Sequence, residues 1–331
     1  MEEYDIIVSL QYEKHKPLTW ARSGMFVMKV AVLYGGTSGE REVSLSSGKG
    51  IIGALEKKGH EVIGIDFNPS KINELLTLDV DVVFIGLHGR FGEDGRIQGL
   101  LDMLNIPYVG SGVLGSALAM NKVKAKRIME SVGIRVARDL AINVETFNRE
   151  NFVMTIEYPV VVKPASEGST IGITIAGNEQ ELLVGIEEAF KHDEDVLIEE
   201  FIAGMEVTVS VLGKKGAEQA LPVIEIVPKN KFYDYEAKYA PGGSDHIIPA
   251  RVSEEITQYL QKNAVLAHQS LNCKTYSRTD FIVPFDGSLP IVLEVNTLPG
   301  MTPTSLFPDA AKEIGLSYED MIERLIELSI K

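Results

Sequence analysis

Strands and helices alternate from the first apolar segment onward, and this alternation restricts the fold more than any other feature of the chain. The segment Lys29–Tyr34 reads KVAVLY and is predicted as a buried strand that leads into Gly35 and Gly36. Further strands are predicted at 61–67, 80–87 and 106–109, with helices at 45–58 and 97–104. Strands separated by helices pair in parallel, because each crossover helix returns the chain to the same edge of the sheet. We therefore expect an α/β fold for this part of the chain.

The rest of the chain has fewer units of this kind, and we expect an α+β arrangement there. The predicted strands are 159–163, 171–175, 196–201, 207–212 and 222–227, and the predicted helices are 116–131, 179–191 and 253–271. The helix at 253–271 has apolar residues near helical spacing. A polar stretch at 228–249 shows no strong periodicity, and a loop of that length usually has a function, such as that of a lid.

Charge and composition exclude several classes of partner. The chain has 331 residues, 47 of them acidic and 32 basic, for a formal net charge of -15, which argues against binding nucleic acid or an anionic membrane surface. Its 45% hydrophobic content allows two or three compact domains. The single cysteine, Cys273, excludes an intramolecular disulfide and is interpreted as a core residue. We find neither a signal peptide nor an apolar run that could span a bilayer, and residues 1–27 are interpreted as an N-terminal extension of unknown role.

Four polar residues lie on what the sequence predicts as two neighbouring strands near the C-terminus. Arg278 and Asp280 share one face of the first strand, and Glu294 and Asn296 share one face of the second, because side chains alternate along a strand. If the strands pair, the four side chains converge. Carboxylate and amide oxygens suit a hard cation such as Mg²⁺ or Mn²⁺, so the pattern predicts a metal site. The alternative is a hairpin whose acids only pair with Arg278.

Two glycine-containing stretches are poor candidates for a nucleotide site. The stretch 47–50 reads SGKG, but Val43 stands where a Walker A loop needs glycine, and no Ser or Thr follows the lysine. Gly110–Gly115 matches G-x-G-x-x-G and opens a helix. A dinucleotide fingerprint, however, needs an acid at the end of the following strand, and the acid at that distance, Glu130, lies inside a predicted helix. We interpret these glycines as shaping a tight domain junction.

A third stretch, 163–172, is the better phosphate candidate. It reads KPASEGSTIG between two predicted strands. The backbone amides of such a turn can bind phosphate oxygens, and Lys163 adds a positive charge. The alternative is a serine-rich hairpin without a ligand.

Six blocks occur in order along the chain: GGTSGEREVSLSSG, LHGRFGEDGRIQG, IPYVGSG, KPASEGSTIGI, FYDYEAKY, and RTDF followed by LEVNTLPGMTPTS. Together they resemble the ATP-grasp superfamily and, within it, the D-alanine:D-alanine ligase family, over residues 29–330. The resemblance implies a Rossmann-like N-terminal domain at 28–121. A two-domain ATP-grasp fold would follow at 122–205 and 206–331, with the lid at 228–249.

The resemblance also implies a role for each site residue. The ATP-binding residues would be Lys122, Lys163 and Lys238 at the phosphates, Glu199 and Ile202 at the adenine, and Glu206 at the ribose. Two Mg²⁺ or Mn²⁺ ions would be held by Asp280, Glu294 and Asn296, while Arg278 and the backbone of Gly300 would stabilise developing charge. The substrate residues would be Glu40 at the ammonium group of the first D-alanine, its partners Ser169 and Tyr239, His88, Glu93, and Ser305 at the second carboxylate.

The implied activity is ATP-dependent ligation of two D-alanines through an acyl phosphate, for peptidoglycan precursor synthesis, by a homodimer in a bacterial cytoplasm. D-alanine:D-serine and D-alanine:D-lactate ligases on the same fold are alternatives, and Tyr239 favours D-alanine. A non-catalytic nucleotide-binding module would be expected to lack some ligands, and none is missing here. Asn121 and Thr279 depart from the commonest family pattern. Neither is expected to disturb the site, since Lys122 is retained and Thr279 should point away from the metal face.

Overall fold

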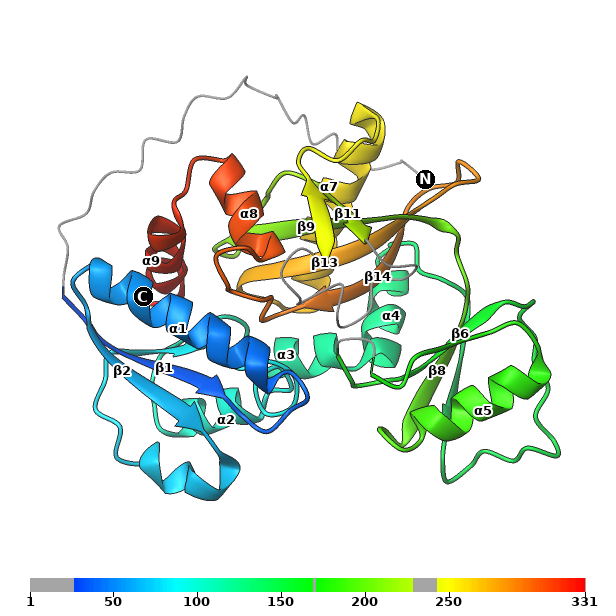
Figure 1. Ribbon diagram of the computed structural model, residues 1–331, viewed down its shortest axis with the longest axis horizontal. Helices are drawn as coiled ribbons and strands as arrows, with labels where there is room; N and C mark the ends of the chain where they lie inside the picture. The colour runs from blue at the N-terminus through cyan, green and yellow to red at the C-terminus, as the bar shows by residue number, and fades with distance from the viewer. Residues whose placement is uncertain (1–26, 169–170, 229–242, 331) are drawn as a thin grey trace, which may run out of the picture.

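The computed structural model describes residues 27–168, 171–228 and 243–330, and it arranges them around three sheets (Figure 1). Three predicted site residues, Ser169, Lys238 and Tyr239, lie outside these ranges, as do residues 1–26 and most of the predicted lid. Within the described ranges, no helix combines the length and the apolar character that crossing a bilayer needs.

The N-terminal unit is a parallel sheet of four strands in the order β2-β1-β3-β4, as the alternating pattern predicts. Its elements are β1 (Lys29–Gly35), α1 (Arg41–Lys57), β2 (Glu61–Phe67), the 3-10 helix η1 (Pro69–Glu74), β3 (Val82–Ile85), α2 (Arg96–Met103) and β4 (Tyr108–Val109). In the central strand β1, Val30, Ala31, Val32 and Leu33 are fully buried. A parallel strand is buried on both faces, so its sequence is continuously apolar rather than alternating.

Two helices connect the N-terminal unit to the rest of the chain where a single helix at 116–131 was predicted. They are α3 (Val113–Met120) and α4 (Lys122–Ser131), and the chain breaks at Asn121, whose ψ of 99° is not helical. The Asn121 side chain accepts a hydrogen bond from the Lys124 amide at 3.0 Å and so caps α4. A Cβ on Gly115 would lie 2.5 Å from the carbonyl oxygen of Asn272, so the backbone of α3 passes close to that of the segment after α7 (Glu254–Ser270).

The central unit is an antiparallel sheet in the order β5-β8-β6-β7, with one helix, α5, packed against β6 and β7. Its elements are β5 (Asp139–Asn143), β6 (Val160–Pro164), β7 (Thr174–Ala176), α5 (Glu179–Ala189) and β8 (Asp195–Glu200). The strand predicted at 171–175 begins only at Thr174, because 171–173 belong to the turn after Gly168. β5 was not predicted; none of its residues is buried, so its apolar pattern is weak.

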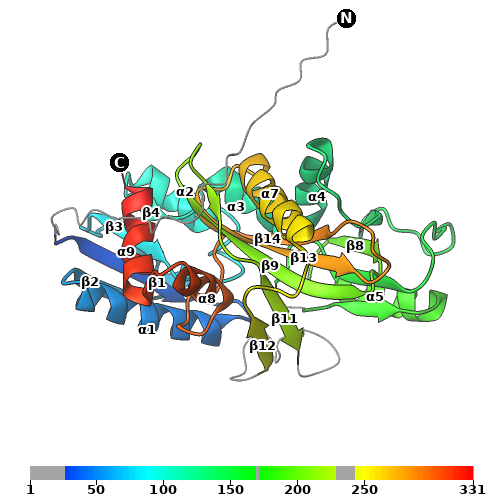
Figure 2. The same cartoon turned by 90° about the horizontal axis from the view of Figure 1, so that it is seen from above.

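The C-terminal unit is a larger sheet in the order β12-β11-β9-β13-β14, with β10 paired to β9. Its elements are β9 (Gly204–Gly213), β10 (Gln219–Ala220), β11 (Ile224–Pro228), β12 (Ser244–Ile247), α7 (Glu254–Ser270), β13 (Thr275–Pro284) and β14 (Ile291–Asn296). Figure 2 shows α7 lying across one face of β9 and β13. β12 corrects the prediction of an unstructured stretch at 228–249, since β12 pairs with β11 there.

The last two helices, α8 (Leu306–Glu313) and α9 (Tyr318–Ser329), return to the N-terminal unit, where α9 lies beside α1 (Figure 1). Met321, Ile322, Leu325 and Ile326 of α9 are fully buried in the same core as the first sheet. Fully burying such side chains contributes about 1.5–3 kcal/mol each. The C-terminal end of the chain therefore completes the core of its N-terminal unit.

Candidate active site

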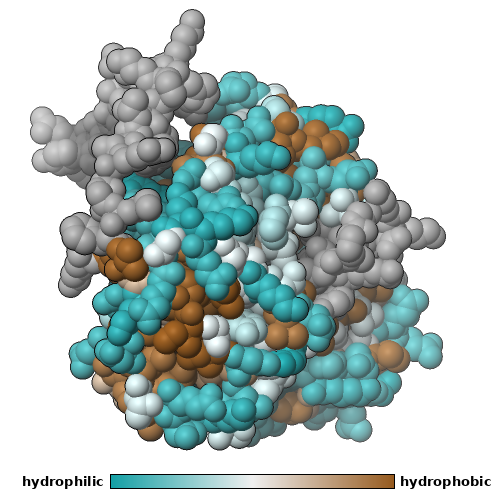
Figure 3. Space-filling view, turned by 60° about the vertical axis from the view of Figure 1, so that its left-hand side comes forward, coloured by the Kyte–Doolittle hydropathy of each residue, from teal (hydrophilic) through white to brown (hydrophobic). Residues whose placement is uncertain are grey.

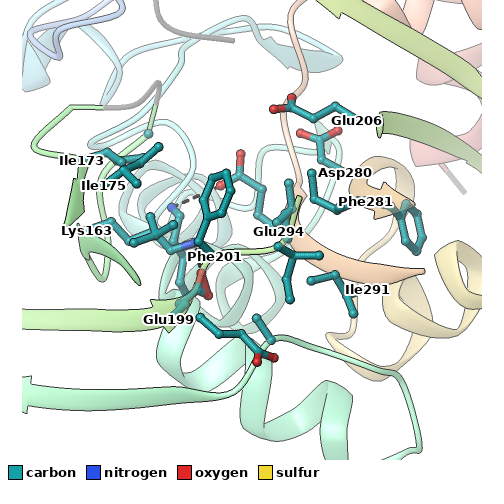
Figure 4. Close-up of a pocket in the computed structure, with 18 of the residues that line it drawn as sticks. Lys163, Ile173, Ile175, Glu199, Phe201, Glu206, Asp280, Phe281, Ile291 and Glu294 are labelled. Atoms are coloured by element: carbon teal, nitrogen blue, oxygen red, sulfur yellow. Dashed lines mark ion pairs between the residues drawn. The ribbon is translucent and has the colours of Figure 1, made fainter. Parts of the chain in front are cut away.

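A cavity of about 710 Å³ lies between the central sheet and the C-terminal sheet. Figure 4 shows Lys163 and Glu199 on one side of it and Glu206, Asp280 and Glu294 on the other. The predicted residues that line the cavity are Lys122, Lys163, Glu199, Ile202, Glu206, Asp280 and Glu294. The two sheets thus bring together residues as far apart in the sequence as Lys163 of β6 and Glu294 of β14.

The predicted hairpin is confirmed in its pairing. Arg278 lies opposite Asn296, and Asp280 lies opposite Glu294, so the four polar side chains share one face of the β13–β14 pair. Asp280 accepts hydrogen bonds from Arg278 at 2.8 and 2.7 Å and from Asn296 at 3.0 Å. Thr279 is fully buried between them on the strand, as expected for a side chain pointing to the other face.

The donor set of this hairpin fits a hard divalent cation. Among the described residues no three His, Cys, Asp or Glu side chains form a metal-binding group, and the predicted set contains only two carboxylates. The third predicted donor is the amide oxygen of Asn296, which is a normal ligand type for Mg²⁺. Asp280 and Glu294 are each compensated by a cation here, since Glu294 lies 3.3 Å from the Nζ atom of Lys122. The salt-bridged hairpin and the metal set are therefore the same cluster.

Lys122 joins the central turn to this hairpin. It is the first residue of α4, and its ammonium donates a 2.6 Å hydrogen bond to the carbonyl of Glu167 in the 163–172 turn. Its own amide donates to the carbonyl of Ala165 at 2.8 Å. Two predicted parts of a phosphate site, the turn and the lysine, are therefore in direct contact.

Glu199, at the cavity wall, forms ion pairs with two lysines. Its Oε2 atom lies 2.6 Å from the Nζ atom of Lys163, and its Oε1 atom lies 2.9 Å from that of Lys126 (the first pair is drawn in Figure 4). Burial raises the pKa of Glu199, but the two lysines together lower it by more than burial raises it. The pKa of Glu199 therefore lies below the ordinary value. This carboxylate is therefore ionised and holds Lys163 at the cavity wall.

The other end of the cavity is apolar. Ile202 and Phe201 follow β8, and Ile173, Ile175 and Ile291 line the same space (Figure 4 labels four of these five). Glu206 lies in β9 on the opposite side from Lys163. A flat aromatic ring fits such a slot, because apolar walls with a few polar groups are typical of ligand pockets.

The predicted ammonium-binding acid, Glu40, lies at the start of α1 and is 6% exposed. A Cβ on Gly89 would lie 3.0 Å, and one on Gly168 2.9 Å, from its Oε2 atom. A Cβ at either position would push on this carboxylate, and at Gly89 the left-handed φ of 66° independently favours glycine. The carboxylate sits between the N-terminal unit and the 163–172 turn.

His88 is buried and uses both ring nitrogens for hydrogen bonds. Nδ1 lies 3.1 Å from the carbonyl of Leu298, which can only accept, and Nε2 lies 3.1 Å from the hydroxyl of Ser47. Nδ1 therefore carries the proton of the neutral ring. Burial lowers the pKa of His88, and Arg278 lowers it further, against Glu40 and the Leu298 carbonyl. His88 is thus a neutral link between the N-terminal unit and the loop after β14.

Glu93 faces the same group of residues. Its Oε2 atom accepts a 2.7 Å hydrogen bond from the amide of Gly89. Burial, with a further contribution from Glu40, raises the pKa of Glu93 to about 8. The side chain is therefore protonated in this state near neutral pH and can donate a hydrogen bond.

Gly300 and Ser305 lie together in the loop after β14. A Cβ on Gly300 would lie 3.1 Å from the Ser305 hydroxyl. The Ser305 hydroxyl accepts a 3.1 Å hydrogen bond from the amide of Thr302 and lies 2.7 Å from the Oγ1 atom of Thr302. This loop faces the N-terminal unit, since Met301 donates to Ser47 on α1.

Three residues that position this site were not identified from the sequence. Thr208 donates a 2.6 Å hydrogen bond to Asp280, Ser47 joins His88 to Met301, and Lys126 holds Glu199. A signal existed for two of them. Thr208 interrupts an apolar strand, and Lys126 lies four residues after Lys122 on the same side of a helix among apolar residues.

Comparison with known proteins gives consistent matches over most of the chain. The family model described as D-ala D-ala ligase C-terminus matches residues 128–327, and that described as D-ala D-ala ligase N-terminus matches 69–111. The D-alanine--D-alanine ligase of Halalkalibacterium halodurans is 67% identical over 92% of this chain and 100% of its own length. That of Carboxydothermus hydrogenoformans is 46% identical over 92% and 99%.

Solved structures are similar over the same span. The D-alanine--D-alanine ligase of Bacillus anthracis complexed with ATP is 32% identical, with a TM-score of 0.80 over 92% of this chain and 97% of that one. The VanG D-Ala:D-Ser ligase of Enterococcus faecalis is also 32% identical, with a TM-score of 0.78 over 92% and 100%.

Proposed function

Because the chain belongs to the D-alanine--D-alanine ligase family and has its ATP-grasp fold, we propose that it joins two D-alanine molecules at the expense of ATP, for peptidoglycan synthesis. The observation that carries this proposal is the 67% identity to a relative of that name over its whole length. The cavity between the two ATP-grasp sheets also supports the proposal, because lysines and carboxylates of the kinds that bind nucleotide phosphates and metal ions line it.

ATP is proposed to bind in the 710 Å³ cavity with its adenine in the apolar end, near Ile202. The phosphates would face Lys122 and Lys163, and the ribose would face Glu206. Lys238 is proposed to join them from the lid, as the family resemblance implies. Preorganised positive charge at the phosphates lowers the barrier to phosphoryl transfer, since that reaction is catalysed mainly by positioning and electrostatics.

Asp280, Glu294 and Asn296 are proposed to hold two Mg²⁺ or Mn²⁺ ions, which supply charge neutralisation for the phosphates when bound. Support comes from the shared face of the hairpin and its hard oxygen donors. Arg278 lies on the same face and adds a permanent positive charge there.

The first D-alanine is proposed to bind with its ammonium at Glu40, assisted by Ser169 and Tyr239, beside His88 and Glu93. The second would place its carboxylate at Ser305. In the first step a carboxylate oxygen of the first D-alanine attacks the γ-phosphorus of ATP, ADP leaves, and an acyl phosphate forms. In the second step the neutral amine of the second D-alanine attacks the acyl carbon, phosphate leaves with the electron pair of the broken C–O bond, and the proton that the nitrogen loses passes to the departing phosphate.

The chain's own groups would stabilise these steps without forming a covalent bond. Arg278 and the amide of Gly300 are proposed to face the developing negative charge, where donors fixed in advance are effective. Water must be excluded, because an acyl phosphate hydrolyses in solvent, and the lid at 228–249 is proposed to do this.

The site assignments correspond to three proposed domains, at 28–121, 122–205 and 206–331. Cytoplasmic location and a homodimer are also proposed. Figure 3 shows a broken apolar area over the N-terminal unit, and exposed apolar residues of that unit include Ile63, Ile72 and Leu76. Light scattering of the purified chain measures its mass in solution, and a monomer at micromolar concentration would contradict the homodimer.

An ADP-release assay with D-alanine, L-alanine or no amino acid tests the activity, with the product identified by mass. We expect ADP and D-alanyl-D-alanine only with D-alanine. A parallel panel with D-serine and D-lactate as second substrates separates the dipeptide ligase from its two alternatives. Well-folded protein that releases no ADP with D-alanine and Mg²⁺ would overturn the proposal.

Replacing Glu294 by Gln tests the metal assignment. The change removes one charged ligand and the partner of Lys122, so we expect turnover to fall by at least about two orders of magnitude, the scale of losing one charge-stabilising group. The fold should be retained, as circular dichroism would show. Glu255→Gln, at the exposed start of α7, is the matched control. Near-normal turnover of Glu294→Gln at low Mg²⁺ would contradict the assignment.

A further inference from the structure

A buried lysine of α4 makes three polar contacts beneath the cavity wall. Lys126 is 1% exposed, and its ammonium donates a 2.8 Å hydrogen bond to the carbonyl of Ala137. It also lies 2.9 Å from Glu199 and 3.2 Å from Asp139. A lysine is almost never fully buried unless it is paired, so these contacts account for its position.

The two acids are neighbours on paired strands. Asp139 of β5 lies directly opposite Glu199 of β8, so the two carboxylates would repel each other without a cation between them. Lys126 contacts both. On its outer side Asp139 is held by Arg127 at 3.1 and 2.5 Å, and on its inner side Glu199 is held by Lys163 at 2.6 Å. Charges therefore alternate from the surface to the cavity.

We propose that Lys126 is a positioning residue for ATP binding, which fixes Glu199 and, through Glu199, holds the Lys163 ammonium at the cavity wall. The inference rests on the proposed function, in which Lys163 contacts the ATP phosphates. Lys126 itself does not line the cavity, so it has no direct contact with the nucleotide.

Charge balance explains why Lys126 is needed. Glu199 faces three ionisable groups, namely Lys163 of β6, Lys126 of α4 and Asp139 of β5. Without Lys126, two facing carboxylates remain with one lysine on the cavity side. The pKa of Glu199 then rises, and protonation releases Lys163 from its 2.6 Å contact. A lysine with no fixed partner has several rotamers, and ordering it again weakens ATP binding.

Steady-state kinetics of Lys126→Met at saturating D-alanine tests the proposal. We expect the KM for ATP to rise about 10–100-fold, the usual effect of losing a partner that orients a ligand-binding group, with a smaller change in kcat. The pH profile of kcat/KM for ATP should gain an acid limb that the parent lacks. Lys126→Arg keeps the charge and should recover part of the affinity. Lys124→Met, on the exposed side of the same helix, should match the parent.

Two further variants separate this role from a purely structural one. Lys126→Met/Asp139→Asn restores the local charge balance, so it should fold even where Lys126→Met does not, keep Glu199 ionised, and recover most of the affinity for ATP. A KM for ATP in that folded double variant as high as in Lys126→Met would overturn the proposal.

Lys163→Met tests the proposed function separately. If Lys163→Met raises the KM for ATP and Lys126→Met does not, the positioning role of Lys126 is wrong but the contact of Lys163 with the ATP phosphates stands. If neither variant changes the KM for ATP, the proposed contact of Lys163 with the phosphates is wrong as well.

Discussion

At the scale of the residue, a buried histidine limits stability in acid. His268 of α7 is 1% exposed, and its Nδ1 atom lies 2.7 Å from the hydroxyl of Ser277 on β13. Burial lowers the pKa of His268 to about 4, with a smaller opposing contribution from Glu218. The neutral ring is therefore part of the packing between α7 and its sheet.

The sign of the resulting pH dependence follows from proton uptake. Between the ordinary pKa of 6.5 and about 4, the unfolded chain binds a proton at His268 and the folded chain does not. Stability is therefore complete above pH 6.5 and falls as the pH is lowered through this window, by on the order of 3 kcal/mol. Urea unfolding at pH 7.5 and at pH 5 measures how much the free energy of unfolding falls between the two pH values. This fall should be much smaller for His268→Gln than for the parent, whereas His192→Gln should show the same fall as the parent. An equal fall for the parent and His268→Gln would refute this assignment.

The contacts of single residues could be predicted where the partners lie close together in the sequence or on two strands whose pairing fixes which side chains share a face. Arg278, Asp280, Glu294 and Asn296 could be placed together, because a strand pair has a fixed alternation. The bond from His88 to the carbonyl of Leu298 could not be predicted, since it joins segments 210 positions apart and the acceptor is backbone. The sequence marked Lys126 as a lysine among apolar residues, but its partner Glu199 could not be predicted, because only the fold brings this residue of α4 against β8.

At the scale of the element, the cap of α4 positions a lysine of the proposed ATP site. Replacing Asn121 by Ala removes the acceptor for the Lys124 amide and should cost about 1 kcal/mol of unfolding free energy. Because Lys122 is the next residue, the KM for ATP should rise too. Asn178→Ala removes the equivalent cap of α5, which accepts from Glu181 at 3.0 Å. It should cost similar stability in urea unfolding and leave the KM unchanged. The same change in KM for both variants would contradict the local role of Asn121.

Elements were predictable where the local sequence carried a clear pattern. β1 and β2 were located to within one residue, β1 because it is continuously apolar and β2, although mostly exposed, because it follows a clear turn. The break at Asn121 was missed because the residues on both sides of it have helical character, and only the non-helical ψ of Asn121 separates them. β5 and β12 were missed because neither contains a buried residue.

At the scale of the whole molecule, α9 should determine the stability of the N-terminal unit. Replacing the fully buried Leu325 by Ala removes core contacts and should cost about 2–5 kcal/mol. Calorimetry should show a lowered melting temperature. Glu327→Ala, on the partly exposed side of α9, removes an ion pair with Arg324 and should change stability by less than about 1 kcal/mol. An unchanged melting temperature for Leu325→Ala would show that α9 does not contribute to this core.

The return of α9 to the first sheet also has a consequence for biosynthesis. The strands β1 to β4 leave the ribosome long before Met321, Ile322 and their neighbours, which cover part of the same core. During most of synthesis the nascent N-terminal unit therefore carries exposed apolar surface, the kind of surface that chaperones bind and that promotes aggregation. Native packing of this unit can be completed only after α9 has left the ribosome.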